Sequence, residues 1–150
     1  MKETSVEEVL EKNWPGLHIE PLQAPENMEV LIGWTGSPAS SPHLVSEVKR
    51  LKSDPIFYGK FLDQSNTCVE NLIYAFKTNN IKGVQKMIRQ NRSIIQQMDK
   101  EATVDIETKK LKLLCDIGER FGGAAKTSGA GGGDCGITII DNKVDKPSIY

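Results

Sequence analysis

The sequence contains few of the residues on which metal sites and disulfide frameworks depend. It has three cysteines and two histidines in 150 residues. Cys68, Cys115 and Cys135 form no Cys-x-x-Cys pair and have no histidine at zinc-site spacing. We therefore expect reduced thiols in a cytoplasmic protein, with neither a disulfide framework nor a bound metal.

The sequence also lacks an excess of either charge and a long apolar run. Nineteen basic residues are balanced by twenty acidic ones, giving a net charge of −1. No basic field therefore favours a nucleic acid or an anionic membrane as partner. No apolar stretch reaches the roughly 20 residues of a membrane-spanning helix. The length fits a single domain with its own core.

Two common phosphate-binding motifs are missing as well. A Walker A loop ends in Gly-Lys-Ser/Thr, whereas here Lys126-Thr127 precedes the glycines. A dinucleotide fingerprint starting at Gly129 requires a glycine at position 134, which is Asp134. The glycines of this chain must serve another purpose.

Apolar patterning predicts four strands. Alternation indicates a half-buried strand at 17–22, and shorter patterns indicate strands at 124–128 and 135–141. The strongest candidate is 28–36, where the continuous run Val30-Leu31-Ile32 is typical of a strand covered on both faces. We expect the two tryptophans, Trp14 and Trp34, to anchor the core.

Four helices are predicted between the second and third strands. Ser41-Pro42 and Asp54-Pro55 each combine a capping side chain with a proline at the first helical position. Asn79-Asn80 and Gly122-Gly123 end helical patterns. The expected ranges are 41–52, 54–76, 81–100 and 106–121. This order predicts an α+β domain with the helices on one face of a small sheet.

The stretch KTSGAGGGDCGI (126–137) has four glycines within five positions: Gly129, Gly131, Gly132 and Gly133. Each glycine costs about 0.5–1 kcal/mol relative to alanine in a regular element, so an ordered loop needs a compensating gain. Bare N–H groups can bind an anion, and each charge-assisted hydrogen bond to phosphate contributes about 1.5–3 kcal/mol. The alternative is a tight or bulged strand connection that needs only positive φ angles.

A second candidate is the segment TGSPASS (35–41). It places hydroxyl groups just before a helix N-terminus, where free N–H groups and the helix dipole favour anions. The alternative is ordinary helix capping, which by itself accounts for the last serine. The hydroxyl-bearing residues are Thr35, Ser37, Ser40 and Ser41.

Three isolated polar residues are possible site-lining groups. Asn91 and Arg92 interrupt the apolar face of the helix at 81–100, either as satisfied buried groups or as part of a site. Lys126 could pair with a phosphate or could be a solvated strand residue.

These segments together resemble one known family. GAAKTSGAGGGDCGITII (123–140) is similar to the C-terminal signature of the GHMP kinases, the family of galactokinase and of homoserine, mevalonate and phosphomevalonate kinases. QNRSIIQQMDKEATVDIETKKLKLLCDIGERFGGAAK (90–126) resembles the helix pair that leads into that signature. PGLHIEPL, VLIGWTGSPASS and the variant GGGDCG are most similar to the bacterial phosphomevalonate kinases. The resemblance covers nearly the whole chain.

The resemblance implies a ferredoxin-like C-terminal domain with a small antiparallel sheet, spanning residues 1–150. The family's Pro-x-x-x-Gly-Leu-Gly-Ser-Ser loop and its N-terminal motif with a substrate-binding lysine are not found in this sequence. We therefore expect a fragment without the ATP-binding half. We also expect it to lack the last helix and strand, with the start of that helix at 145–150.

The implied reaction is transfer of a phosphoryl group from ATP to phosphomevalonate, giving ADP and diphosphomevalonate in isoprenoid biosynthesis. ATP, Mg²⁺ and the catalytic residues would be held mainly by the other half, so the fragment alone is expected to be inactive. Two alternatives remain. One is a related kinase of mevalonate or homoserine, and the other is a non-catalytic phosphate-binding module.

The resemblance also implies roles for the two candidate loops. The glycine segment would present N–H groups, and the first serine's hydroxyl, to the transferring or acceptor phosphate. The 35–41 segment would hold the phosphate already on the acceptor, with Ser40 foremost. Asp134 could orient the loop through backbone N–H groups or could meet a cation. We favour the bracing role, because bare phosphate would repel its carboxylate. The residues expected in the glycine segment are Ser128, Gly129, Ala130, Gly131, Gly132 and Gly133.

Overall fold

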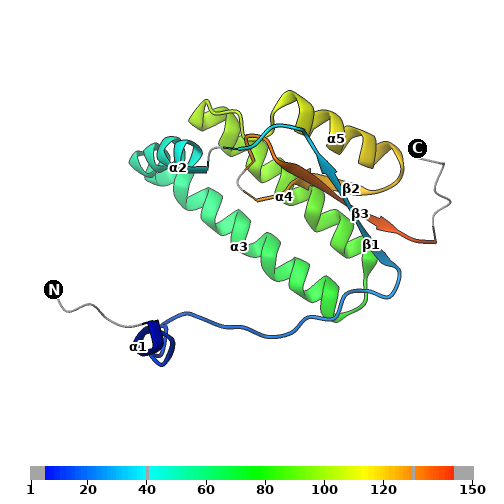
Figure 1. Cartoon of the computed structure of the whole chain (residues 1–150), viewed down its shortest axis with the longest axis horizontal. Helices are drawn as coiled ribbons and strands as arrows, with labels where there is room; N and C mark the ends of the chain where they lie inside the picture. Colours follow the sequence, from blue (N-terminus) through cyan, green and yellow to red (C-terminus); the bar gives the residue numbers. More distant parts are fainter. Residues whose placement is uncertain (1–5, 40, 130, 144–150) are drawn as a thin grey trace.

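A three-stranded antiparallel sheet forms the centre of the computed structural model, which describes residues 6–39, 41–129 and 131–143. Its strands are β1 (Met28–Trp34), β2 (Ala124–Thr127) and β3 (Cys135–Asp141), in the spatial order β1-β3-β2. β3 pairs with β1 along its whole length and with β2 over residues 136–139. Figure 1 shows the sheet between α5 and the long helices α3 and α4.

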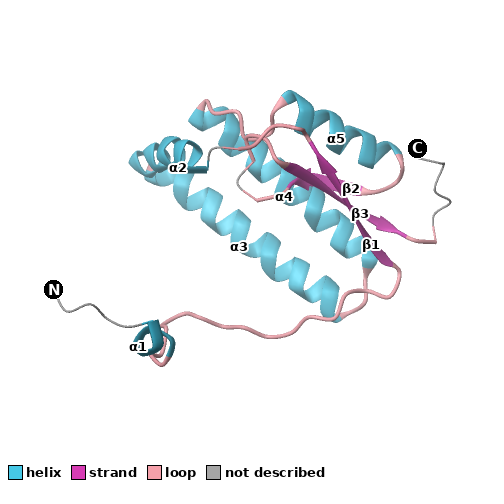
Figure 2. Ribbon diagram, in the orientation of Figure 1, coloured by secondary structure: helices cyan, strands magenta, loops and turns pink. Residues whose placement is uncertain are grey.

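Side-chain caps fix the two helix starts expected at Asp54-Pro55 and near Ile81, and the cap at Asn80 was not predicted. The Asp54 carboxylate accepts hydrogen bonds from the N–H groups of Ile56 and Phe57, and the Asn80 side chain accepts one from Gly83. Both predicted starts are therefore confirmed. The helical elements, shown in Figure 2, are α1 (Val6–Leu10), α2 (Ser41–Lys49), the short 3₁₀ helix η1 (Arg50–Ser53), α3 (Pro55–Lys77), α4 (Ile81–Ala102) and α5 (Lys109–Arg120).

The helices α3 and α4 cover one face of the sheet. Ala124 of β2 and Ile139 of β3 are directly paired, so their side chains share a face. Both belong to a buried cluster whose other members come from α3 and α4, namely Ala75, Ile81, Val84 and Ile88. Burying each of its isoleucine and valine side chains stabilises the fold by about 1.5–3 kcal/mol. This cluster fixes the long helices to the sheet.

The helix α5 lies against the opposite face. Thr138 directly precedes Ile139 in β3, so its side chain points to the opposite face of the sheet. Gly118 of α5 and Gly123 just after it both lie directly against Thr138, and a Cβ at either position would collide with it. The predicted α+β class is confirmed. The expectation that all helices lie on one face of the sheet is wrong for α5. Gly118 and Gly123 have no side chains, so α5 can pack closely on the second face.

The prediction that β1 is covered on both faces is wrong. Val30, Ile32 and Trp34 are exposed by 46%, 71% and 69%, whereas Leu31 and Gly33 between them face α5. β1 is an edge strand of the described sheet, whereas α4 lies over β2 and β3 and α3 packs on α4. Trp34 is therefore not a core anchor, and Trp14 is also about half exposed.

The strand expected at 17–22 is not formed. Leu17 and Ile19 are both largely exposed, and this segment pairs with no strand of the described residues. It is held near the end of α3 by an ion pair between Glu20 and Lys77, with 2.6 Å between Oε1 and Nζ. Alternating apolar residues make a strand possible, but only a partner strand provides its hydrogen bonds.

The outer edge of β2 is covered by side chains from the two flanking helices. Glu119 of α5 accepts a hydrogen bond from the Ala125 N–H at 3.1 Å, and Arg89 of α4 donates to the Gly123 carbonyl. Arg89 and Glu119 also form an ion pair at 2.7 Å. The Ala125 N–H and the Gly123 carbonyl, which could otherwise pair with a further strand, therefore bond to helix side chains.

Two expectations concern the chain near the ends of elements. The helix expected at 106–121 begins at Lys109, so Ile106 lies in the connection before it. The helix start expected at 145–150 lies outside the described residues. Within the described ranges, no helix has the length and apolar character needed to span a bilayer.

Candidate phosphate-binding site

The two candidate segments of the sequence lie side by side at one end of the sheet. We call residues 128–134 the glycine loop and residues 35–38 the hydroxyl loop. Trp34 pairs with Cys135, so the chain leaving β1 meets the chain entering β3. Two backbone hydrogen bonds continue that pairing, from Thr35 N–H to the Asp134 carbonyl and from Asp134 N–H to the Ser37 carbonyl, both 2.8 Å. The antiparallel topology therefore unites the two loops.

The backbone of the glycine loop is left-handed at most of its positions. Gly129, Gly131 and Gly132 have φ angles of 67°, 77° and 76°, and Asp134 has φ of 52°. A Cβ on Gly131 would lie 2.5 Å from the Ile106 carbonyl oxygen, whereas nothing lies within 4 Å of one on Gly129. The close contact between Gly131 and Ile106 explains why position 131 has no side chain. Gly129 lies in an open position.

Some N–H groups of the glycine loop already form hydrogen bonds within the protein. Ser128 N–H donates to the Cys135 carbonyl at 2.9 Å, and Gly132 N–H donates to the Ile106 carbonyl at 2.7 Å. Among the described residues, the N–H groups of Gly129, Gly131 and Gly133 donate to no partner. Gly129 is the exposed one of the three. The expected set of N–H donors from 128 to 133 therefore loses Ser128 and Gly132, whose N–H groups are bonded within the protein. Ala130 lies outside the described residues.

Asp134 braces the loops through its main chain. Its N–H and its carbonyl both bond to the hydroxyl loop, and it takes the left-handed conformation that aspartate tolerates better than most residues. These are main-chain contacts, so the bracing role expected of the Asp134 carboxylate stays a prediction.

The hydroxyl loop is held by its own side chains. The Thr35 hydroxyl donates to the Ser37 carbonyl at 3.1 Å and accepts from the Ser37 N–H at 3.3 Å. The Ser37 hydroxyl accepts from Lys110 and keeps its own proton available for a further acceptor. Ser40 lies outside the described residues, and Ser41 begins α2 with a side chain that the structure does not describe.

Lys110 lies at the candidate site and was not predicted from the sequence. Its Nζ donates to the Thr35 carbonyl at 3.0 Å and to the Ser37 hydroxyl at 3.3 Å. Thr108 caps α5, so Lys109 and Lys110 lie in the first helical turn, where the helix dipole disfavours cations. Two lysines at such a position were a signal that the sequence contained. Lys110 brings a positive charge to the hydroxyl loop and forms no ion pair within the described residues.

Arg92 is a satisfied, largely buried group. Its guanidinium donates to both carboxylate oxygens of Glu107 at 2.7 Å and to Asp116 at 3.1 Å. Burial raises the pKa of Glu107, but the hydrogen bonds and charge of Arg92 outweigh it, and the net pKa is lowered. Of the two readings that the sequence left open for Arg92, the structure shows the paired one. Asn91 lies beside it on α4, half-buried.

Lys126 is turned back onto its own chain. Its Nζ donates to the Thr127 carbonyl at 2.7 Å. Burial lowers the pKa of this ammonium group. A partly buried lysine with a lowered pKa is less suited to bind phosphate than the exposed Lys110.

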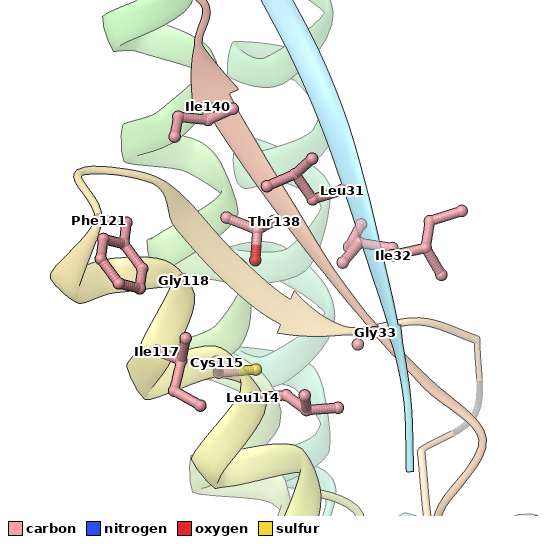
Figure 3. Close-up of a pocket in the computed structure, with 12 residues that line it drawn as sticks. Leu31, Ile32, Gly33, Leu114, Cys115, Ile117, Gly118, Phe121, Thr138 and Ile140 are labelled. Atoms are coloured by element: carbon pink, nitrogen blue, oxygen red, sulfur yellow. The ribbon is translucent and has the colours of Figure 1, made fainter. Parts of the chain in front are cut away.

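A separate cavity of about 160 Å³ lies between α5 and the sheet. Figure 3 shows Leu31, Leu114, Ile117, Phe121 and Thr138 around it, with α5 in front of the sheet. Its lining is almost wholly apolar and has no charged side chain. This cavity therefore does not have the donors that an anion requires, unlike the loops at the end of the sheet.

A family model matches the part of the chain that contains the glycine loop. The model describes the C-terminal region of the GHMP kinases and matches residues 72–150. This chain belongs to the GHMP kinase family. The matched residues include α4, α5, β2 and β3, so the elements that position the glycine loop are those of the family. The resemblance expected from the sequence is confirmed.

Individual relatives extend the likeness to nearly the whole chain. A phosphomevalonate kinase of Streptomyces sp. (strain CL190) is 36% identical over 146 residues, which are 97% of this chain and 39% of that protein. The structure of the Lin0012 protein from Listeria innocua is 39% identical, with a TM-score of 0.86 over 94% of this chain and 40% of that one.

A third relative has been solved with ligands. It is the phosphomevalonate kinase of Streptococcus pneumoniae, in complex with phosphomevalonate and AMPPNP. It is 28% identical, with a TM-score of 0.77 over 93% of this chain and 39% of that one. This chain therefore spans about two fifths of the length of the relatives that it matches.

Proposed function

We propose that this chain is the C-terminal half of an ATP-dependent phosphomevalonate kinase and that its two loops bind phosphate. One observation carries the proposal: the glycine loop and the hydroxyl loop are joined by backbone hydrogen bonds and lie next to the ammonium group of Lys110. The likeness to phosphomevalonate kinases over nearly the whole chain supports it. The acceptor is an anion, and this end of the sheet offers donors and a positive charge.

The proposed roles follow from which donors are free. The N–H groups of Gly129, Gly131 and Gly133 are unpaired within the described residues and would donate to phosphate oxygens. The Ser37 hydroxyl and Lys110 would bind the phosphate that the acceptor already carries. Phosphoryl transfer depends mainly on positioning and charge stabilisation, so such donors are the principal contribution that this half can make.

We assign ATP and Mg²⁺ to the part of the kinase outside this chain, together with the catalytic residues. Among the described residues no group of three or more His, Cys, Asp or Glu side chains could hold a metal ion. When bound, Mg²⁺ would neutralise charge on the transferred phosphoryl group. We retain the cytoplasm as the proposed location and phosphomevalonate as the acceptor.

A substrate panel tests the proposal. The complete protein that carries this chain is assayed for ADP release with ATP and, separately, phosphomevalonate, mevalonate and homoserine. We expect kcat/KM for phosphomevalonate to exceed the others by about a hundredfold or more, because a site built to bind a phosphate leaves its donors unpaired when that group is missing. The 150-residue chain alone should release no ADP.

Each alternative has its own result. A preference for mevalonate or homoserine would replace the proposal with a related kinase. ADP release from none of the three, with phosphate still bound, would identify a non-catalytic module. Turnover by the 150-residue chain alone would contradict the division of labour between the halves.

A further inference from the structure

The connection between α4 and α5, residues 103–108, is the surface on which the centre of the glycine loop rests. The Ile106 carbonyl accepts the Gly132 N–H at 2.7 Å. A Cβ on Gly131 would lie 2.5 Å from both the γ2 methyl group and the carbonyl oxygen of Ile106. Ile106 itself is 4% exposed. The position of one buried residue therefore determines where the middle of the loop lies.

The carboxylate of Asp99 holds Ile106 in place. One oxygen accepts the Ile106 N–H at 2.9 Å, and the other accepts the Glu107 N–H at 3.1 Å. α4 ends soon after Asp99, at Ala102, and Thr103 takes a left-handed conformation with φ of 54°. The chain thus reverses direction after α4, and the Asp99 side chain of that helix binds the backbone of the connection.

The residue after Ile106 is fixed from its other side. The Glu107 side chain is 5% exposed and forms two hydrogen bonds with Arg92, and Gln96 donates a third. Arg92 and Gln96 are residues of α4, as is Asp99. The connection is therefore bound to α4 through both the backbone and a buried side chain, so a displacement of Ile106 must break contacts with Asp99.

We propose that Asp99 is a positioning residue for the glycine loop, acting through Ile106. The proposal rests on the proposed function, since it assigns Asp99 to the geometry of the phosphate-binding loop. Among the described residues, Asp99 forms no hydrogen bond or ion pair with the glycine loop. Its two hydrogen bonds fix the position of the Ile106 carbonyl, and that carbonyl in turn fixes the position of the Gly132 N–H. When the Asp99 bonds are lost, the free N–H groups on either side of Gly132 move relative to the hydroxyl loop.

Hydrogen exchange on the complete protein tests the mechanical part. Asp99→Asn keeps one strong acceptor, Asp99→Ala keeps none, and Asp105→Asn is the matched control because Asp105 is exposed in the same connection and makes no described contact. We expect exchange at the Gly132 amide to be about tenfold faster in Asp99→Ala, less so in Asp99→Asn, and unchanged in Asp105→Asn. Equal exchange in all three variants would overturn the proposal.

Kinetics of the same variants test the functional part. At a temperature where every variant is folded, we expect kcat to fall about tenfold or more in Asp99→Ala, with an intermediate value in Asp99→Asn and an unchanged KM for ATP. A merely structural role would lower the unfolding midpoint and leave kcat per folded molecule unchanged, which would overturn the proposal. If the complete protein phosphorylates no acceptor at all, the proposed function fails, whereas the exchange measurement still decides whether Asp99 positions the loop.

Discussion

The glycine loop and the hydroxyl loop are neighbours, but they are held in place by different means. The glycine loop is shaped by backbone that packs on backbone: Gly131 against the Ile106 carbonyl and Gly133 against the Ser37 carbonyl. The hydroxyl loop is shaped by side chains, through the Thr35 hydroxyl and the ammonium group of Lys110. Side-chain contacts can be removed one at a time, whereas a backbone approach tolerates no added atom. The two loops should therefore respond differently to substitution.

The largest expected effect is that of Gly131→Val. The new Cβ would overlap the Ile106 carbonyl, and a β-branched side chain is strained at φ of 77°. We expect the free energy of unfolding to fall by about 3 kcal/mol or more, together with loss of acceptor binding. Urea unfolding and calorimetric titration of phosphomevalonate into the complete protein measure the two effects.

Gly129→Ala is the matched control for that variant. Gly129 has a similar φ of 67° but open space around it, so only conformational strain of about 1–2 kcal/mol applies. Equal losses in the two variants would show that packing on Ile106 is not what requires glycine at position 131.

A smaller, pH-dependent effect is expected for Glu107→Gln, which weakens the support beneath the glycine loop. At neutral pH the variant leaves Asp116 as the one carboxylate paired with the largely buried Arg92 among the described residues, and we expect a loss of about 2 kcal/mol, below the usual cost of breaking a fully buried pair. The folded-state pKa of Glu107 is lowered, so the wild-type advantage is complete above its unfolded value of about 4.3 and is lost as pH falls through the folded value.

Urea unfolding of both proteins between neutral and acid pH checks this expectation. The difference in unfolding free energy should shrink as the pH drops. A difference that stays constant across that range would mean that the Glu107 charge contributes nothing to the support.

The smallest expected effect is that of Lys110→Met, in the hydroxyl loop. Lys110 is exposed, so its loss should leave stability nearly unchanged. We expect KM for the phosphorylated acceptor to rise about tenfold, through loss of a charge-assisted hydrogen bond. Lys109→Met removes the same charge from the adjacent position, which makes no described contact, and should leave KM unchanged. Similar KM values in the two variants would exclude a specific role for Lys110.

The parts of the fold that were predicted correctly depend on short-range chemistry. Asp54-Pro55 begins a helix because the Asp54 side chain bonds to N–H groups two and three residues away, and Asn79-Asn80 separates two helices as expected. The failures all depend on distant partners. The apolar run of β1 reads as fully buried, but α3 and α4 do not cover it, and the alternation at 17–22 has no strand beside it. Lys110 was missed because it lies 73 residues from Ser37 in sequence.

The sequence by itself determined the starts of α3 and α4, the strand that follows the glycine loop, and the family, because each of these is encoded in residues close together along the chain. Only the tertiary structure decided that α5 packs on the second face of the sheet, that the glycine loop rests on Ile106, and that Lys110 faces the hydroxyl loop. Such contacts join segments far apart in the chain. They are set by which surfaces can approach closely, a property of shape that no local pattern records.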